Sequence, residues 1–103
     1  MASAPQRWAV RARPELFDTI DYLLAGEQRS DFLVNHLFAI VDQFAARFDR
    51  LATVRGRDPA RWRFLVGATE SLGYVVAGRL APDGVIELYD IEFDLNPPWA
   101  DRG

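Results

Sequence analysis

Residues 61–93 contain the pattern that most constrains this chain, because they predict three neighbouring antiparallel strands. The expected strands are 61–67, 71–80 and 85–93, and Ala81-Pro82-Asp83-Gly84 joins the last two. Proline presets φ for a turn and Asp-Gly accepts left-handed backbone geometry, so this loop is typical of a β-hairpin. The hairpin therefore predicts an antiparallel sheet.

The length of the hairpin loop predicts the register of its two strands. A loop of four residues places Leu80 opposite Val85, and the same register gives the pairs Val76–Tyr89, Tyr74–Ile91 and Leu72–Phe93. Side chains alternate between the two faces of a strand, so these residues are expected to share one face. That face is apolar, and upstream segments must cover it.

One short strand and two helices are predicted before the sheet. Residues 7–13 alternate between apolar and polar, which is typical of a half-buried strand. Proline and glutamate open residues 14–25, and a glycine follows them, so the first helix is expected there. After a loop over residues 26–29, Ser30 is a favourable N-cap for a second helix that ends near Ala52.

The second helix carries a wide apolar face. Its main stripe consists of Leu33, Leu37, Ile40, Phe44, Phe48 and Leu51, and a second line consists of Val34, Phe38, Val41 and Ala45. This face is wider than one sheet requires. We therefore expect the helix to contact the first helix as well, or a second subunit.

These elements predict a single α+β domain of 103 residues. The order is β-α-α-β-β-β, with the helical hairpin packed on one face of an antiparallel sheet. Residues 1–6 and 96–103 are expected to be flexible tails. The expected core consists of Trp8, Val10, Leu16, Ile20, Leu37, Phe44, Phe64, Tyr74, Val76, Tyr89 and Ile91.

Composition narrows the functional classes. The absence of cysteine excludes disulfides, thiolate metal sites and thiol nucleophiles. A net charge of −3 disfavours nonspecific nucleic-acid binding, although all 12 basic residues are arginine. No signal peptide is recognisable, and no apolar run approaches the ~18 residues of a membrane span, so we expect a cytoplasmic protein with no membrane partner.

Side chains that could carry out chemistry are few and scattered. His36 is the only histidine, and a structural or surface role is expected because no second histidine or cysteine can join it. Thr69 and Ser71 lack a nearby base, and there is no phosphate-binding loop, so no metal or nucleotide cofactor is expected. A solvated edge is a better interpretation than a metal site for the acids of the last strand, Glu87, Asp90, Glu92 and Asp94.

The sheet face away from the helices is the expected partner-binding surface. An apolar centre ringed by arginine and carboxylate side chains is typical of protein interfaces. The residues assigned to this surface are Arg61, Arg63, Leu65, Val75, Ala77, Arg79 and Leu88. The alternative is that ordinary β-propensity placed valine and leucine on a solvated face. Trp62 lies on the same side as Phe64 and is expected in the core, not on a platform for stacking bases.

The order of elements and the sequence of residues 62–93 resemble the RelE/ParE family of bacterial toxins. In this resemblance Trp62-Arg63 corresponds to the family's aromatic–Arg pair, Gly67 to its turn glycine and Tyr74 to its strand tyrosine. The resemblance implies the toxin of a toxin–antitoxin pair, with a cognate antitoxin as its partner. Such a toxin acts on RNA and the ribosome or on a DNA topoisomerase.

Three positions depart from the family pattern. Ser71 stands where the family commonly has arginine, Leu65 where it often has a basic residue, and Glu92-Phe93-Asp94 where it often has His-Arg. RNA cleavage in the family relies on a basic sheet face that grips phosphates. The resemblance therefore implies the fold and a binding role, and it leaves open whether the chain is an enzyme.

Two other functions are compatible with the sequence. The first is a non-enzymatic interaction module on the same scaffold, either an adaptor or an immunity-type dimer. The second is a small-molecule enzyme, which is disfavoured because no set of titratable groups converges in the sequence.

Overall fold

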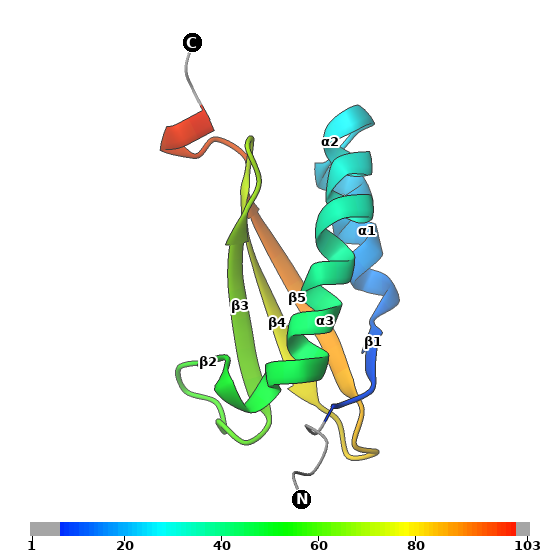
Figure 1. Cartoon of the computed structure of the whole chain (residues 1–103), viewed down its shortest axis with the longest axis vertical. Helices are drawn as coiled ribbons and strands as arrows, with labels where there is room; N and C mark the ends of the chain where they lie inside the picture. Colours follow the sequence, from blue (N-terminus) through cyan, green and yellow to red (C-terminus); the bar gives the residue numbers. More distant parts are fainter. Residues whose placement is uncertain (1–6, 101–103) are drawn as a thin grey trace, which may run out of the picture.

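One five-stranded sheet organises the chain, with the strands in the order β1-β5-β4-β3-β2 (Figure 1). The computed structural model describes residues 7–100. Strand β1 pairs parallel with β5, and all other neighbours are antiparallel, so the sheet is mixed. The strands are β1 (Val10–Ala12), β2 (Ala52–Thr53), β3 (Trp62–Ala68), β4 (Gly73–Leu80) and β5 (Ile86–Asp94).

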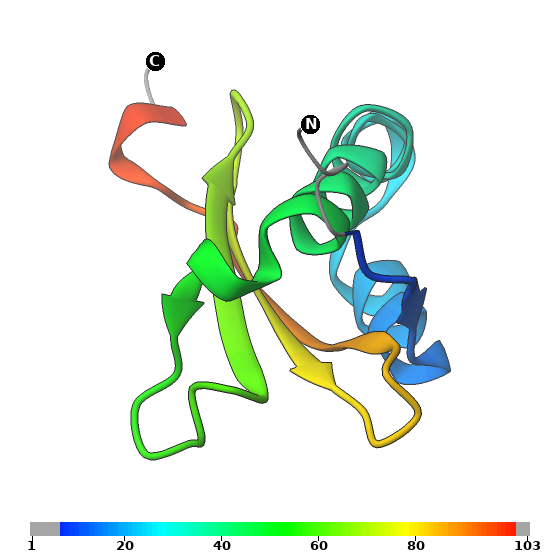
Figure 2. The same ribbon diagram turned by 60° about the horizontal axis from the view of Figure 1, so that its bottom comes forward.

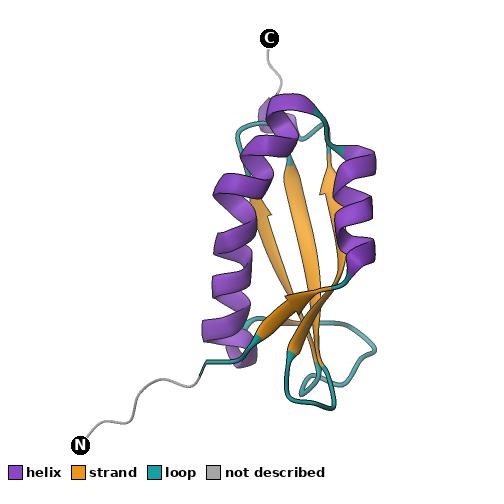
Figure 3. Ribbon diagram, turned by 90° about the vertical axis from the view of Figure 1, so that its right-hand side faces the viewer, coloured by secondary structure: helices purple, strands orange, loops and turns teal. Residues whose placement is uncertain are grey.

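The α-helices all lie on the same face of this sheet (Figures 2 and 3). After α1 (Pro14–Leu23), the chain turns and runs without a break through α2 (Gly26–Asp31), a π-helical segment (Phe32–His36) and α3 (Leu37–Arg47). A 3₁₀ turn at Phe48–Arg50 ends this long helix. The predicted α+β class, with helices packed on a sheet, is confirmed.

The helix boundaries differ from the prediction at both ends of the long helix. Residues 26–29, expected as a loop, already belong to α2, so Ser30 lies inside the helix and is not its N-cap. The turn between the helices is tight because Gly26 adopts a φ of 55°, which glycine accepts without strain. At the other end Ala52 belongs to β2, a short edge strand that was not predicted.

A π-helical turn brings Phe32 into the core. The Leu37 N–H donates to the Phe32 carbonyl, so this segment contains one extra residue. An α-helix turns about 100° per residue, and the extra residue therefore rotates the preceding part by about that angle. The rotation aligns Phe32 with the buried Ile40 and Phe44, whereas Leu33 of the predicted stripe is only half-buried.

The predicted hairpin register is wrong. The loop is closed by the Ala81 N–H, which donates to the Val85 carbonyl at 2.9 Å, so Leu80 pairs with Ile86 instead of Val85. A β-bulge shifts the register once more between Ala77 and Gly78, giving the pairs Val76–Ile91 and Tyr74–Phe93. The bulge leaves both Leu88 and Ile91 buried. It places Tyr89 on the opposite face, where it contacts Trp62.

The faces of β3 are also the reverse of the prediction. Leu65 pairs with the buried Val76 and packs against the core, so the odd-numbered residues of β3 face the helices. Trp62, Phe64 and Val66 therefore face away from the helices. The alternation of residues in β3 does not show which side faces the helices, because both sides carry apolar residues.

The core lies between the helices and the sheet. Of the predicted core residues, Leu16, Ile20, Phe44, Tyr74, Val76 and Ile91 are buried in it, and Trp8, Val10 and Leu37 are half-buried against it. Phe64 and Tyr89 lie on the other face. Residues that were not in the predicted core complete it: Leu24, Phe32, Ile40, Phe48, Leu51, Leu72, Ile86 and Leu88.

Two glycines of the sheet allow aromatic rings to lie directly on the backbone. A Cβ at Gly78 would collide with the ring of Phe44, and a Cβ at Gly67 would collide with the ring of Tyr74. Both positions therefore require the smallest residue.

Part of the predicted C-terminal tail is ordered against the sheet. Pro97 is buried, Pro98–Ala100 form a 3₁₀ turn, and the Trp99 indole Nε1–H donates to the Thr69 carbonyl at 3.2 Å. The other residues assigned to tails, 1–6 and 101–103, lie outside the described residues. Among the described residues, no helix combines the length and the apolar character needed to cross a bilayer.

Removal of the Phe44 ring tests this core. Phe44 is fully buried, so Phe44→Ala should lower the free energy of unfolding by roughly 3–5 kcal/mol. Phe38→Ala is the matched control on the same helix: Phe38 is 75% exposed, and its loss should change stability by no more than about 0.5 kcal/mol. Urea denaturation measures both values. Equal effects of the two substitutions would contradict the assigned helix faces.

Tyr74 should make the fold sensitive to alkaline pH. Burial raises the pKa of the Tyr74 phenol above its usual range. The neutral phenol therefore contributes its full stabilisation below the ordinary tyrosine pKa of about 10, and this contribution is lost as the pH rises through the folded-state pKa. The free energy of unfolding should fall above about pH 10, and it should fall less in Tyr74→Phe. If the free energy of unfolding fell with pH to the same extent in the wild type and in Tyr74→Phe, the predicted role of the Tyr74 phenol would be contradicted.

Candidate functional site

The sheet face away from the helices, here called the outer face, is more apolar than a solvated sheet face usually is. Val66 and Val75 are 64% and 37% exposed on it. Figures 1 and 2 show that no α-helix covers this side of β3, β4 and β5; the short 3₁₀ turn Pro98–Ala100 lies on this side, beyond the end of β5. Its other residues along the strands are Trp62, Phe64, Ala77, Arg79, Glu87, Tyr89, Asp90, Glu92 and Asp94.

An arginine–aromatic cluster occupies the end of the outer face near the β4–β5 hairpin. The rings of Trp62 and Tyr89 meet edge to face with their centroids 5.1 Å apart. The guanidinium of Arg13 lies 4.0 Å from the Tyr89 centroid, and that of Arg57 lies 4.8 Å from the Trp62 centroid. Arg79 lies 5.5 Å from Tyr89 and 6.0 Å from Trp62. These distances are those of cation–π contacts.

Carboxylates neutralise part of this cluster. The half-buried Glu87 accepts from Arg79 Nη2 at 3.1 Å and from Arg11 Nε at 3.2 Å. Arg11 Nη1 also donates to Asp83 at 2.7 Å, and this hydrogen bond is the main cause that lowers the pKa of Asp83 and raises that of Arg11. Arg57 forms no ion pair with a described residue, so it is the cation of the cluster that is left to meet an outside carboxylate.

The opposite end of the outer face carries a cleft of about 330 Å³. Val66 and Val75 form its apolar wall, and Trp99 from the C-terminal turn closes one side. The exposed carboxylates of Glu92 and Asp94 also line it. Trp99 was not predicted as a site residue because only the folded turn brings it back to the sheet.

The predicted partner-binding residues are divided between the two sides of the sheet. Val75, Ala77 and Arg79 lie on the outer face, as expected. Leu88 is fully buried in the core, so its assignment to the outer face is wrong. Leu65 packs against the core from the helix side. The two errors have different causes: for Leu88 it is the hairpin register, in which Leu80 pairs with Ile86, and for Leu65 it is the reversed faces of β3.

Arg63 is a structural residue and lies on the helix side of β3. Its Nε donates to the Pro59 carbonyl at 2.7 Å, and its Nη1 donates to the carbonyls of Asp49 and Leu51 at 3.0 and 2.8 Å. These bonds hold the 3₁₀ turn and the segment before β3 against the sheet. Arg61 is exposed at the start of β3, where its carbonyl accepts from the Leu80 N–H at 2.8 Å.

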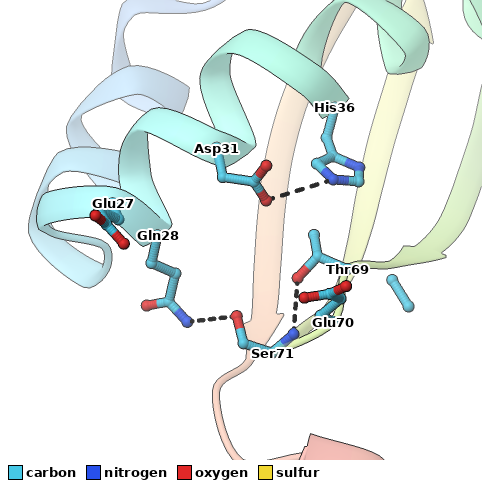
Figure 4. Close-up of a pocket in the computed structure, with 8 residues that line it drawn as sticks. Glu27, Gln28, Asp31, His36, Thr69, Glu70 and Ser71 are labelled. Carbon is cyan, nitrogen blue, oxygen red and sulfur yellow. Dashed lines mark hydrogen bonds and ion pairs between the residues drawn. The ribbon is translucent and has the colours of Figure 1, made fainter.

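A second, polar pocket of about 690 Å³ lies between α2 and the β3–β4 turn. Figure 4 shows that it brings together the reactive side chains His36, Thr69 and Ser71. His36 Nε2 lies 3.6 Å from Asp31 Oδ2, which is longer than a hydrogen bond. The remaining lining residues are Glu27, Gln28, Ala68 and Glu70.

The hydroxyls in this pocket hold the turn in place. Thr69 Oγ1 accepts from the Ser71 and Leu72 N–H groups at 3.1 and 3.2 Å. Ser71 Oγ accepts from Gln28 Nε2 at 3.3 Å, which ties the turn to α2. No hydrogen bond joins His36 to either hydroxyl among the described residues, so the pocket lacks the base–nucleophile pair of covalent catalysis.

The described residues contain no group of three or more side chains arranged to hold a metal ion. Comparison of the chain with models of known families finds no match, and comparisons with curated proteins and with solved structures find no significant match. The geometry of the chain itself therefore identifies the candidate site: the outer face carries exposed valines and aromatic rings, whereas the larger pocket is lined mainly by polar side chains.

The role of Arg63 is testable by stability. Arg63→Met removes three hydrogen bonds to backbone carbonyls and should lower the free energy of unfolding by about 2 kcal/mol or more. Arg61→Met, which removes an equal charge from the exposed start of the same strand, should change it by no more than about 0.5 kcal/mol. If the two variants unfolded at the same denaturant concentration, the three hydrogen bonds of Arg63 would not stabilise the fold.

Proposed function

We propose that the chain is a protein-binding domain and that its outer face receives a segment of a partner protein. The observation that carries this proposal is the outward side of β3 and β4, where Trp62, Phe64, Val66 and Val75 lie without a covering helix. Val66 and Val75 are exposed, and Trp62 and Phe64 are half-buried. Apolar side chains bordered by arginine and carboxylate groups are typical of the centre and polar rim of an interface.

The size of the outer face favours a segment over a globular partner. Strands β3, β4 and β5 contain seven, eight and nine residues, and every second one points outward, which gives about a dozen outward side chains. A globular interface of standard size uses about 20–30 residues on each side. One helix or one extended segment would cover the outer face.

The resemblance to the RelE/ParE toxins supports the antitoxin as the source of that segment. The support is a first strand, a helical hairpin on one side of the sheet and the antiparallel strands β3, β4 and β5 in the same order as in the family, with the short β2 as an additional edge strand. In this proposal the chain is the toxin of the pair and acts by binding its target, RNA and the ribosome or a DNA topoisomerase. Binding is favoured over cleavage because the outer face holds no histidine among the described residues that could act as an acid or base beside its carboxylates.

A single charge on the outer face should abolish partner binding. Val75→Asp places a carboxylate among the apolar residues of the proposed interface but leaves the core untouched. We expect co-purification with the protein encoded by a neighbouring small gene to be lost, together with any relief of toxicity that this protein gives. Val34→Asp, at a position 66% exposed on the helix side, is the matched control and should retain both.

Circular dichroism must show that both variants are folded. Retention of the neighbouring gene product by a folded Val75→Asp variant would contradict the proposal. The Leu88→Asp variant is unsuitable here, because Leu88 is fully buried and the substitution is expected to unfold the domain.

A further inference from the structure

We propose that the cleft at the Trp99 end of the outer face binds an arginine or lysine side chain of the partner segment. This inference rests on the proposed function and specifies the chemistry of the partner at one site. The cleft combines an aromatic ring, two valines and two carboxylates: Trp99, Val66, Val75, Glu92 and Asp94. A long basic side chain is the group that matches all of these surfaces at once.

Trp99 is held in place although it is 56% exposed. Its indole N–H is tied to the Thr69 carbonyl, and its ring lies over Gly73, where an added Cβ would be 3.5 Å from Cη2. The buried Pro97 anchors the turn that carries it. An exposed but anchored indole offers a flat surface that loses little freedom when a guanidinium or an ammonium group stacks on it.

The carboxylates of the cleft are free to accept a cation. Glu92 and Asp94 are exposed on β5 opposite Val75 and Gly73, and neither forms an ion pair with a described residue. Asp94 Oδ1 accepts the Asn96 N–H at 3.0 Å, which fixes the carboxylate and leaves its second oxygen available. A charge-assisted hydrogen bond to a basic side chain would use these oxygens.

The arginines of the outer face are too far away to pair with the carboxylates of Glu92 and Asp94. The arginine–aromatic cluster lies near Arg79, about 20 Å along β4 from Gly73. The outer face therefore has an arginine-rich end and an end at which the exposed Val66 and Val75 lie beside Glu92 and Asp94. A partner segment that matches it carries its basic residue at the Trp99 end, with apolar residues next to it that pack on Val66 and Val75.

Tryptophan indole N–H resonances allow a direct test, because the three tryptophans of the chain lie in different places. Trp99 is in the cleft and Trp62 is in the arginine–aromatic cluster. Trp8 packs on Phe48, with ring centroids 5.9 Å apart, and serves as the internal control. The probe is the peptide acetyl-Val-Arg-Val-amide, compared with the same peptide carrying neutral citrulline in place of arginine.

We expect the arginine peptide to shift the Trp99 indole resonance saturably while the Trp8 resonance stays in place. The citrulline peptide should bind about tenfold more weakly or not at all. The Glu92→Gln/Asp94→Asn variant should lose about the same factor, and higher salt should weaken binding. The control variant Glu27→Gln/Glu70→Gln, which removes two carboxylates from the polar pocket, should bind the arginine peptide like the wild type.

Equal binding of the two peptides, or a response at Trp62 instead of Trp99, would overturn the inference. Failure of the inference is distinguishable from failure of the proposed function. If a folded Val75→Asp variant no longer binds the neighbouring gene product but the cleft of the wild type does not bind the arginine peptide, only the inference fails. If the cleft binds the peptide but that variant keeps the gene product, the proposed function fails, and with it the assignment of the basic side chain to a partner segment.

Discussion

The contact between Phe44 and Gly78 is the constraint on which the rest of the structure depends. The ring of Phe44 on α3 lies where any side chain at Gly78 of β4 would be. Gly78 pairs with Leu88 on β5 at the point where the β-bulge shifts the register. The ring of the long helix that lies directly on the sheet backbone is therefore placed where β5 changes its alternation, next to the buried Leu88.

The bulge has consequences on both sides of the sheet. On the helix side, Leu88 and Ile91 both fill the core although they are three residues apart. On the outer face, Tyr89 is available to meet Trp62 and to stack under Arg13. Bulges often redirect a side chain in this way. The arginine–aromatic cluster is thus a product of the same irregularity that completes the core.

The sequence predicts the fold because an apolar pattern that extends over many residues is little changed when a single residue is inserted. The hairpin loop, the alternation of residues 7–13 and the helical spacing of the apolar residues were enough to predict an α+β domain with its helices on one side of the sheet. Local detail was lost wherever one residue is inserted. The π-helical turn exchanges Leu33 for Phe32 in the core, and one extra residue in the hairpin loop, which pairs Leu80 with Ile86, exchanges Tyr89 for Leu88.

The candidate site was harder to predict than the fold for a physical reason. A strand with apolar residues on both sides, such as β3, gives no indication of which side faces the core, so Leu65 and Arg63 were assigned to the wrong face. Arg63 was expected to contact a partner, but it holds the chain's own carbonyl groups. Val75, Ala77 and Arg79 were placed on the correct face because the alternation of β4 is regular up to the hairpin.

Valine-methyl NMR of the chain mixed with the protein proposed as its partner, the product of a neighbouring small gene, tests the central claim most directly, because it reports which surface a partner covers. Val66 and Val75 are exposed on the outer face, and Val34 is exposed on the helix side. We expect the methyl resonances of Val66 and Val75 to shift and to show contacts with the partner, while those of Val34 stay in place. Contacts at Val34 with unchanged resonances at Val66 and Val75 would contradict the claim that the outer face is the binding surface.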